Sequence, residues 1–362
     1  SLGMPDAARP TRRHWRTTLV APARRPSQHF PSLVPAVHRG STVVFERLRD
    51  AVDDWQQIER YTYGLYGTPT TLELGLRIAE LEGARHTFIT PGGQAALALV
   101  YLAYCRSGSH ALVPASAYGP NLEIGRDLLA GLGIEVETYD PAAGAAIAQR
   151  LRDSTALVWC ESPGSITMDV QDVPAIVDAA HARGIPVALD NTYAAGVLFD
   201  AFAHGVDVSV QALTKFVGGH SDVLLGSISV ADDDAYARVG TAHRVIGMAV
   251  SPDDCALALR GLQTLGVAVV AGVTSVVRPS AMVVAIAGVA VWMVVTPVVA
   301  QVMLRKHVPP TLRPAGFIRQ AKYFGILTRM VVTGYLVIMF AAMLGAAVLL
   351  GLLLLGVVRV LL

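Results

Sequence analysis

Three features of this 362-residue chain carry groups that could act together: Lys215, Asp190 and a glycine pair at 92–93. Lys215 is the first lysine in the chain, and arginine supplies the fixed positive charges before it. A lysine amine can lose its proton and condense with an aldehyde, whereas a guanidinium group stays protonated. Lys215 lies between an apolar stretch and a second glycine pair, which favours a chemical role over that of an ordinary surface lysine.

Asp190 ends an apolar run that begins at residue 185. A carboxylate at the end of a buried strand is costly unless it has a partner. One such partner is the protonated pyridine nitrogen of a cofactor that withdraws electrons from a substrate. The same residue could instead cap the N-terminus of a helix, and the local sequence leaves both interpretations open.

The turn at 90–94 joins a predicted strand to a predicted helix and contains Gly92 and Gly93. Glycines let the backbone approach an anion closely, and a helix N-terminus offers N–H groups and a partial positive charge. A phosphate cradle fits this turn, and so does a plain strand-to-helix connection. Neither of the glycine-rich nucleotide-binding motifs GxGxxG and GxxxxGK[ST] is present here, which disfavours dinucleotide or nucleoside triphosphate binding.

The elements that must position these residues alternate between short apolar runs and helix-length segments. This alternation predicts an α/β fold with a mostly parallel sheet covered by helices. The predicted strands are 86–90, 111–114, 134–139, 156–160, 185–190 and 207–213, and the predicted helices are 94–105, 122–132, 145–152 and 173–183. Ligands bind such sheets at the carboxyl ends of the strands. The lysine, the aspartate and the glycine turn all follow strand ends, so we expect them to meet there.

Composition narrows the class of protein further. The net charge of +1 indicates no nucleic-acid partner. The three cysteines are far apart, which favours reduced thiols over disulfides or a metal site. Residues 1–60 are predicted to form an N-terminal arm that is rich in arginine at first and has no apolar signal segment. We therefore expect a cytoplasmic location for the core at 61–266.

The last part of the chain, 267–362, has a different composition. The runs 281–304 and 330–358 contain no charged residue, and each is long enough to cross a hydrocarbon layer of ~30 Å. They are predicted to be two transmembrane helices that associate the chain with a membrane through 281–362. The basic linker at 305–329 would then lie in the cytoplasm and the core outside, which conflicts with the expected location of the core. We interpret the tail as a fusion or a reading-frame artefact.

Four ordered motifs carry a resemblance to a known family. Residues from about 35 to 266 resemble the Cys/Met-metabolism family of pyridoxal 5'-phosphate (PLP) enzymes, fold type I, and are most similar to its β-lyase members. The motifs are 161–168, with a Glu-Ser-Pro signature, 190–197 around the aspartate, 214–222 around the lysine, and 260–266. The resemblance implies the large domain of that fold, with the family's smaller C-terminal domain missing after Gly266.

The resemblance also implies roles for single residues. Lys215 would attach the cofactor and remove the substrate Cα proton, and Asp190 would keep the cofactor ring nitrogen protonated. The ring of Tyr118 would stack on the cofactor, and Tyr63 would reach in from a neighbouring subunit of a dimer or tetramer. The cofactor phosphate would be held by Gly93, Gln94 and Thr214.

The reaction implied is carbon–sulfur lysis of a sulfur amino acid: α,β-elimination of cystathionine to homocysteine, pyruvate and ammonia. Two departures from the family pattern stand beside it. Leu65 occupies the position where many members have an arginine for the cofactor phosphate, and no substrate-carboxylate arginine is recognisable after Gly266. The alternative is therefore a catalytically impaired PLP-binding remnant attached to a membrane segment.

Overall fold

A computed structural model describes residues 14–20, 34–51, 55–56, 61–165 and 167–269. These residues belong to the first of two compact units of the chain, which ends at Gly272. Within this described part, no helix has the length and apolar character needed to cross a bilayer. The segments 281–304 and 330–358 lie outside the described residues, so the membrane tail stays a prediction from composition.

The centre of the fold is a seven-stranded sheet in the order β1-β7-β6-β5-β4-β2-β3. Strands β2 to β6 run parallel, whereas β7 pairs antiparallel with both β6 and β1. The strands are β1 His86–Thr90, β2 His110–Pro114, β3 Glu135–Tyr139, β4 Thr155–Glu161, β5 Val187–Asp190, β6 Val208–Gln211 and β7 Gly226–Val230. The predicted α/β fold with a mostly parallel sheet is confirmed. Strand β7 is not among the predicted strands.

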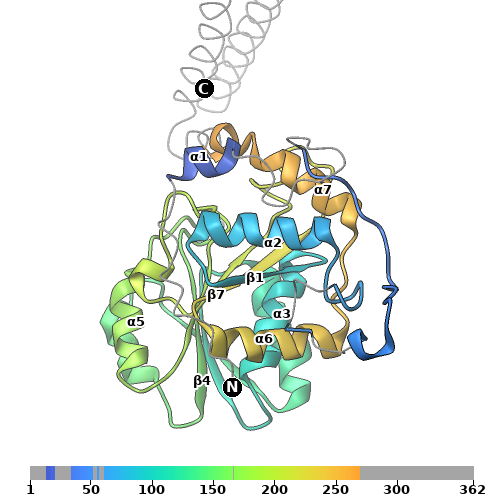
Figure 1. Ribbon diagram of the computed structural model, residues 1–362. Helices are drawn as coiled ribbons and strands as arrows, with labels where there is room; N and C mark the ends of the chain where they lie inside the picture. The colour runs from blue at the N-terminus through green and yellow to red at the C-terminus, as the bar shows by residue number, and fades with distance from the viewer. Residues whose placement is uncertain (1–13, 21–33, 52–54, 57–60, 166, 270–362) are drawn as a thin grey trace, which may run out of the picture. The chain divides into compact units, whose positions relative to one another are not determined.

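Helices cover both faces of the sheet. Helices α1, α2 and α7 lie on one side of it and α3 and α6 on the other, as Figure 1 shows. The α-helices are α1 Trp15–Val20, α2 Pro69–Glu82, α3 Gly93–Tyr104, α4 Gly119–Glu123, α5 Val173–His181, α6 Asp233–Ile246 and α7 Pro252–Leu262. Shorter turns are η1 Leu48–Asp50, η2 Ile124–Leu129, η3 Ala130–Leu132, η4 Gly144–Arg150 and η5 Phe202–His204. The predicted helix at 145–152 is a tight 3₁₀ turn, η4.

Local sequence explains where the helices that support the site begin and end. Thr68 caps α2 through the N–H of Thr71, and Gly83 ends the helix in the left-handed conformation that glycine tolerates best. Ser251 caps α7, and Pro252 follows at the first helical position, where its missing N–H is no loss. These caps fix the ends of both helices on the same side of the sheet.

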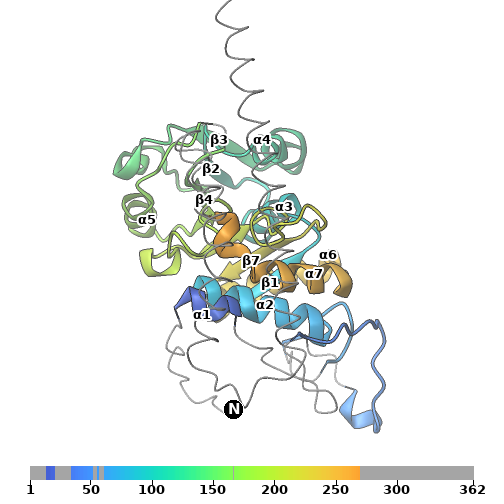
Figure 2. The same ribbon diagram turned by 90° about the horizontal axis from the view of Figure 1, so that it is seen from above.

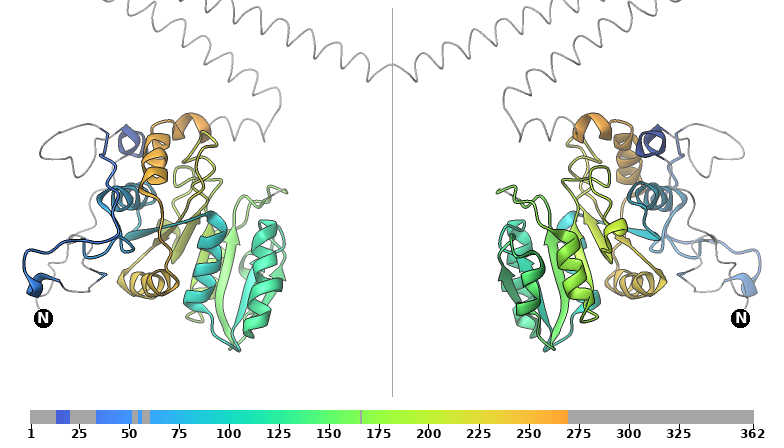
Figure 3. Two further views of the ribbon diagram at one scale, coloured as in Figure 1. Left: turned by 90° about the vertical axis from the view of Figure 1, so that its right-hand side faces the viewer. Right: turned by 90° about the vertical axis from the view of Figure 1, so that its left-hand side faces the viewer.

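The core lies on both faces of the sheet because alternate strand residues point to opposite sides. One cluster, which includes Trp159, packs under α3 and α6, and a second joins α2 and α7 to the sheet. Figure 3 shows α7, in orange, beside α1, in dark blue, and Figure 2 shows α5 next to β4. A third cluster lies under α5.

The ends of the described core differ from simple expectation. Leu19 of α1 is buried in the cluster under α2 and α7, and Arg77 donates a hydrogen bond to the carbonyl of Thr18. Part of the predicted N-terminal arm is therefore packed against the core. At the other end, Val269 is only 3% exposed in the same cluster. The core thus continues past Gly266, and the domain boundaries stay a prediction.

A candidate cofactor site at the carboxyl edge of the sheet

Thr192 joins the two strands that carry the predicted acid and the predicted lysine. Its N–H donates to Oδ1 of Asp190 at 3.0 Å, and its hydroxyl accepts the N–H of Ala212 at 2.9 Å. The N–H of Lys215 donates to the carbonyl of Ala212 at 3.0 Å, which starts the turn after β6. Since β5 and β6 are parallel neighbours, Asp190 and Lys215 leave the sheet on adjacent loops at one edge.

Asp190 does not cap a helix. The residues after it form turns, and its carboxylate accepts from the N–H of Thr192 within that turn. Burial raises the pKa of Asp190, while the bonds from Thr192 oppose this shift. No ion pair of Asp190 is found among the described residues, so this acid has a free side for a cationic or N–H partner.

The N-terminus of α3 approaches the same loops. A Cβ placed on Gly93 would lie 2.7 Å from the Cβ of Ala212. The first helical hydrogen bond in α3 runs from Ala96 to the carbonyl of Gly92 at 3.1 Å, and no side chain caps the helix. The N–H groups of Gly93 and Gln94 precede that bond. They are therefore available to an anion, and the helix dipole favours one there.

Thr214 is tied down more than its predicted role requires. Its hydroxyl donates to the carbonyl of Leu225 and accepts the N–H of the same residue, both at 3.1 Å. A threonine hydroxyl has one proton to donate. In this arrangement Thr214 holds the lysine loop to the start of β7, and a bond to a phosphate would require its hydroxyl to turn.

The two predicted tyrosines lie in different surroundings. Tyr118 follows β2 at the carboxyl edge and precedes α4, and it is 41% exposed. Tyr63 is 45% exposed and forms an isolated bridge with Thr42. Among the described residues, no contact joins Tyr63 to Lys215 or Asp190. One chain therefore brings together Gly93, Asp190 and Lys215 and leaves Tyr63 apart, and its role in a neighbouring subunit stays a prediction.

Glu161 lies beside Asp190 and was not predicted as a site residue. The two acids are register partners at the ends of β4 and β5, so their side chains point to the same face. Burial and the charge of Asp190 raise the pKa of Glu161 to about 7. The sequence did hold a signal, because Glu161 ends the apolar run 156–160 as Asp190 ends its own run.

A second buried acid, Glu82, lies under the same loops from the α2 side. Its Oε1 accepts hydrogen bonds from the side-chain amides of Gln211 and Asn191. These residues directly precede Ala212 and follow Asp190. Burial raises the pKa of Glu82. Nothing in the local sequence of α2 indicates this connection, which depends on how the helix packs on the sheet.

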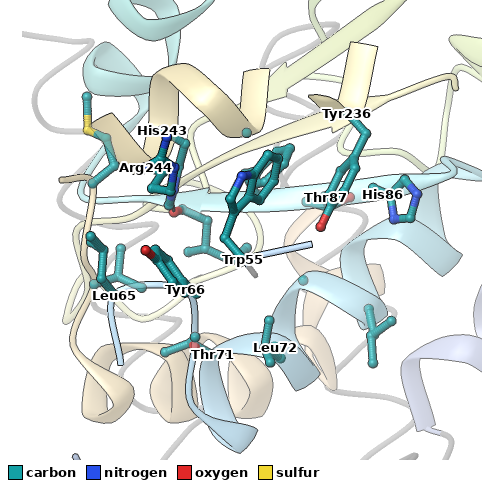
Figure 4. Close-up of a pocket in the computed structure, with 18 of the residues that line it drawn as sticks. Trp55, Leu65, Tyr66, Thr71, Leu72, His86, Thr87, Tyr236, His243 and Arg244 are labelled. Atoms are coloured by element: carbon teal, nitrogen blue, oxygen red, sulfur yellow. Dashed lines mark hydrogen bonds between the residues drawn. The ribbon is translucent and has the colours of Figure 1, made fainter. Parts of the chain in front are cut away.

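A cavity of about 100 Å³ lies elsewhere, beside the edge strand β1. Figure 4 shows its aromatic lining, with Trp55, Tyr66 and Tyr236. None of the predicted site residues lines it, so the cavity and the carboxyl edge are separate places. Leu65, which stands where many family members have arginine, does face this cavity.

A group of potential metal ligands also lies away from the carboxyl edge. His110, Glu135 and Glu137 bring their ligand atoms within 4.8 Å of one another. Arg152 pairs with both carboxylates, and Arg150 pairs with Glu137. Two arginines balance the two acids, so the group offers no net negative charge to a cation.

The comparison with known families decides what this edge is built for. Residues 16–285 match the family described as Cys/Met metabolism PLP-dependent enzyme. The chain belongs to this family. PLP is the family's cofactor, and the family matches well beyond Gly266.

Individual relatives agree with the family assignment. The chain is 42% identical over 250 residues to a protein of Rhizobium johnstonii that is provisionally named cystathionine beta-lyase, covering 69% of this chain and 62% of that one. It is 37% identical over 257 residues to cystathionine beta-lyase MetC of Escherichia coli, covering 69% and 64%. An L-alanine/L-glutamate racemase of Wolbachia pipientis is 32% identical over 259 residues, covering 68% and 63%. The chain thus spans under two thirds of the length of these relatives.

Solved structures share the fold. The crystal structure of cystathionine gamma synthase from Xanthomonas oryzae has a TM-score of 0.65 and 28% identity, covering 70% of this chain and 64% of that one. The crystal structure of metB from Corynebacterium glutamicum has a TM-score of 0.66 at 24% identity, covering 70% and 65%, and shows the fold alone. The family therefore includes relatives that are named for different reactions.

The residues at the carboxyl edge fit PLP. The free N–H groups of α3 suit its phosphate, and the carboxylate of Asp190 suits a protonated ring nitrogen. Lys215 is exposed at the same edge, where its amine is accessible to an aldehyde. These three groups come from three separate loops that Ala212 and Thr192 hold together.

Proposed function

We propose that this chain is a PLP-dependent carbon–sulfur lyase that cleaves cystathionine by α,β-elimination. The observation that carries the proposal is the convergence of Gly93, Asp190 and Lys215 on one edge of the sheet, linked by Ala212 and Thr192. Each of the three offers what a different part of PLP needs: N–H donors, a carboxylate and an amine. Net, cystathionine and water give homocysteine, pyruvate and ammonia.

Each residue has a defined task in this reaction. Lys215 holds the cofactor before the substrate arrives, and its released amine then takes the proton from the substrate Cα. The same amine can return a proton to the sulfur that leaves from Cβ, so the step is neutral overall. Asp190 holds the proton on the ring nitrogen. PLP, when bound, supplies the electron sink that makes the Cα proton acidic.

The preference for β-elimination rests on resemblance. The segments 162–168 and 194–197 resemble those of β-lyase members, and the relatives from Rhizobium and Escherichia carry β-lyase names. The racemase and the synthase among the relatives begin with the same loss of the Cα proton or use the same cofactor edge. The bond that breaks next depends on which substrate bond stands perpendicular to the cofactor ring.

The substrate is a small sulfur amino acid, and the active unit is at least a dimer in this proposal. Tyr63 is exposed and separate from Lys215 in its own chain. An exposed tyrosine on an extended segment suits a role in a partner's site. Sedimentation of the full chain, with Tyr63→Ala compared with Tyr66→Ala for activity, tests this arrangement.

Absorption spectroscopy of the purified full chain tests the cofactor site. Added PLP should give a band at ~420 nm that borohydride treatment removes. The band should be absent in Lys215→Ala and in Lys215→Arg, because a guanidinium cannot make the covalent link. Lys306→Ala is the matched control and should keep the band. A band that survives in Lys215→Arg would overturn the proposal.

Product analysis tests the reaction. Release of pyruvate and a thiol from cystathionine supports the lyase. A protein with the band that releases neither product is the impaired, PLP-binding alternative. Racemisation of L-alanine without pyruvate release would instead assign the reaction of the Wolbachia relative.

A further inference from the structure

We infer that Glu161 is a positioning residue whose carboxyl group fixes the backbone of Tyr118, and with it the tyrosine ring, at the cofactor edge. The inference deepens the proposed function and rests on it, because the ring matters only if a cofactor binds there. It adds a residue that acts through another residue and need not touch the cofactor.

The geometry around Glu161 is complete on the protein side. Oε2 accepts the N–H of Tyr118 at 2.7 Å, and Oε1 accepts the N–H of Ser165 at 2.7 Å. The backbone N–H of Glu161 itself donates to the side chain of Gln171 at 2.8 Å. The two acceptor bonds come from two different loops, one after β2 and one after β4.

Burial makes this arrangement specific. Glu161 is 2% exposed, and a buried carboxyl group without hydrogen bonds is strongly unfavourable. Hydrogen bonds from N–H groups to a carboxylate are short and strong, so these two loops are held more firmly than by neutral acceptors. Glu161 therefore trades its own burial for the fixed position of both loops.

The hold on Tyr118 determines where its ring can lie. Its N–H is bound to Glu161, and its carbonyl accepts the N–H of Asn121 at 2.7 Å as α4 begins. With both ends of the residue fixed, only the side-chain torsions remain free. The ring is 41% exposed at the carboxyl edge, so it is open to a planar partner.

A double-mutant cycle on PLP affinity tests whether Glu161 acts through Tyr118. Glu161→Gln keeps the size of the side chain but replaces one acceptor oxygen with an NH₂ donor. We expect a rise of about tenfold in the PLP dissociation constant. Tyr118→Ala should raise it by a similar factor. The double variant should be little worse than either single one, because both remove the same contribution.

A general structural role would give a different result. If Glu161 only stabilises the sheet, the two effects multiply to about 100-fold in the double variant, which would overturn the inference. Glu137→Gln makes the same chemical change on β3 and should leave PLP affinity unchanged. An unchanged affinity in Glu161→Gln would also contradict the inference.

Hydrogen exchange without cofactor separates this inference from the proposed function. In the wild-type chain the amides of Tyr118 and Ser165 should exchange slowly, and in Glu161→Gln at least one of them should exchange faster, relative to the amide of Cys160. Equal rates in the two proteins would overturn the inference even if PLP binds. Failure of the wild-type chain to bind PLP, with the exchange difference present, would overturn the proposed function alone.

Discussion

Gly93 and Ala212 lie so close together that a Cβ on the glycine would be 2.7 Å from the alanine Cβ and 3.0 Å from its Cα. This contact seats the first residue of α3 on the loop that leads to Lys215. The space between them suits only glycine, so the contact couples the position of the free N–H groups of α3 to that of the lysine.

Replacement of Gly93 by alanine should therefore separate α3 from the lysine loop. We expect a loss of about 1–3 kcal/mol in the free energy of unfolding from overpacking, together with weaker PLP binding. Urea unfolding and PLP titration measure the two effects. Gly92→Ala is the matched control for stability, because a Cβ there meets nothing within 4 Å. Equal stability of both variants would contradict the prediction.

Gly261 on α7 supports the lysine loop from the other side. A Cβ there would lie 2.1 Å from the carbonyl oxygen of Val217 and 2.5 Å from that of Gly218. Backbone atoms cannot turn aside as a side chain can, so Gly261→Ala should push α7 from the loop and destabilise the fold by about 1–3 kcal/mol. Thermal unfolding checks this. Gly131→Ala, where a Cβ has open space, should change stability little.

The stability of the chain without cofactor should depend on the ionisation of Glu161. The pKa of this group rises from 4.5 to about 7 in the folded chain, chiefly through burial. The native state then binds the proton more tightly than the unfolded state, so stability is lost as pH rises between these values. The loss should be on the order of 2–3 kcal/mol, and Asp190 contributes in the same direction.

Urea unfolding at pH 4.5, 5.5 and 7 measures this dependence. Glu161→Gln cannot ionise, so its stability should fall less steeply over the same range. A slope identical to that of the wild-type chain would show that another group carries the effect.

Glu82 should matter through the amides that it accepts. Glu82→Leu leaves the side-chain amides of Asn191 and Gln211 without this acceptor, which costs about 1–3 kcal/mol for each group left unsatisfied. Glu82→Gln keeps an acceptor oxygen and should cost much less. Chemical denaturation of the two variants gives the comparison. If the leucine variant were as stable as the glutamine variant, the buried hydrogen bonds would contribute little.

Much of the fold could be predicted because its signals are local. Each of the six predicted strands overlaps a strand of the sheet, since short apolar runs between turn residues specify buried strands without reference to distant segments. The positions of Lys215, Asp190 and Gly93 after strand ends are also properties of the chain itself. In a parallel sheet, that alone predicts that they gather at one edge.

Other features depended on which strands became neighbours. Glu161 and Tyr118 are 43 residues apart, and only the order of β2, β4 and β5 places the carboxyl group of one against the backbone of the other. The network of Glu82 likewise required α2 to pack beneath β5 and β6. The sequence by itself determined the strands, the turns and the reactive residues. The tertiary structure decided which buried acids hold them, because hydrogen bonds between distant segments depend on register and packing, which no local pattern records.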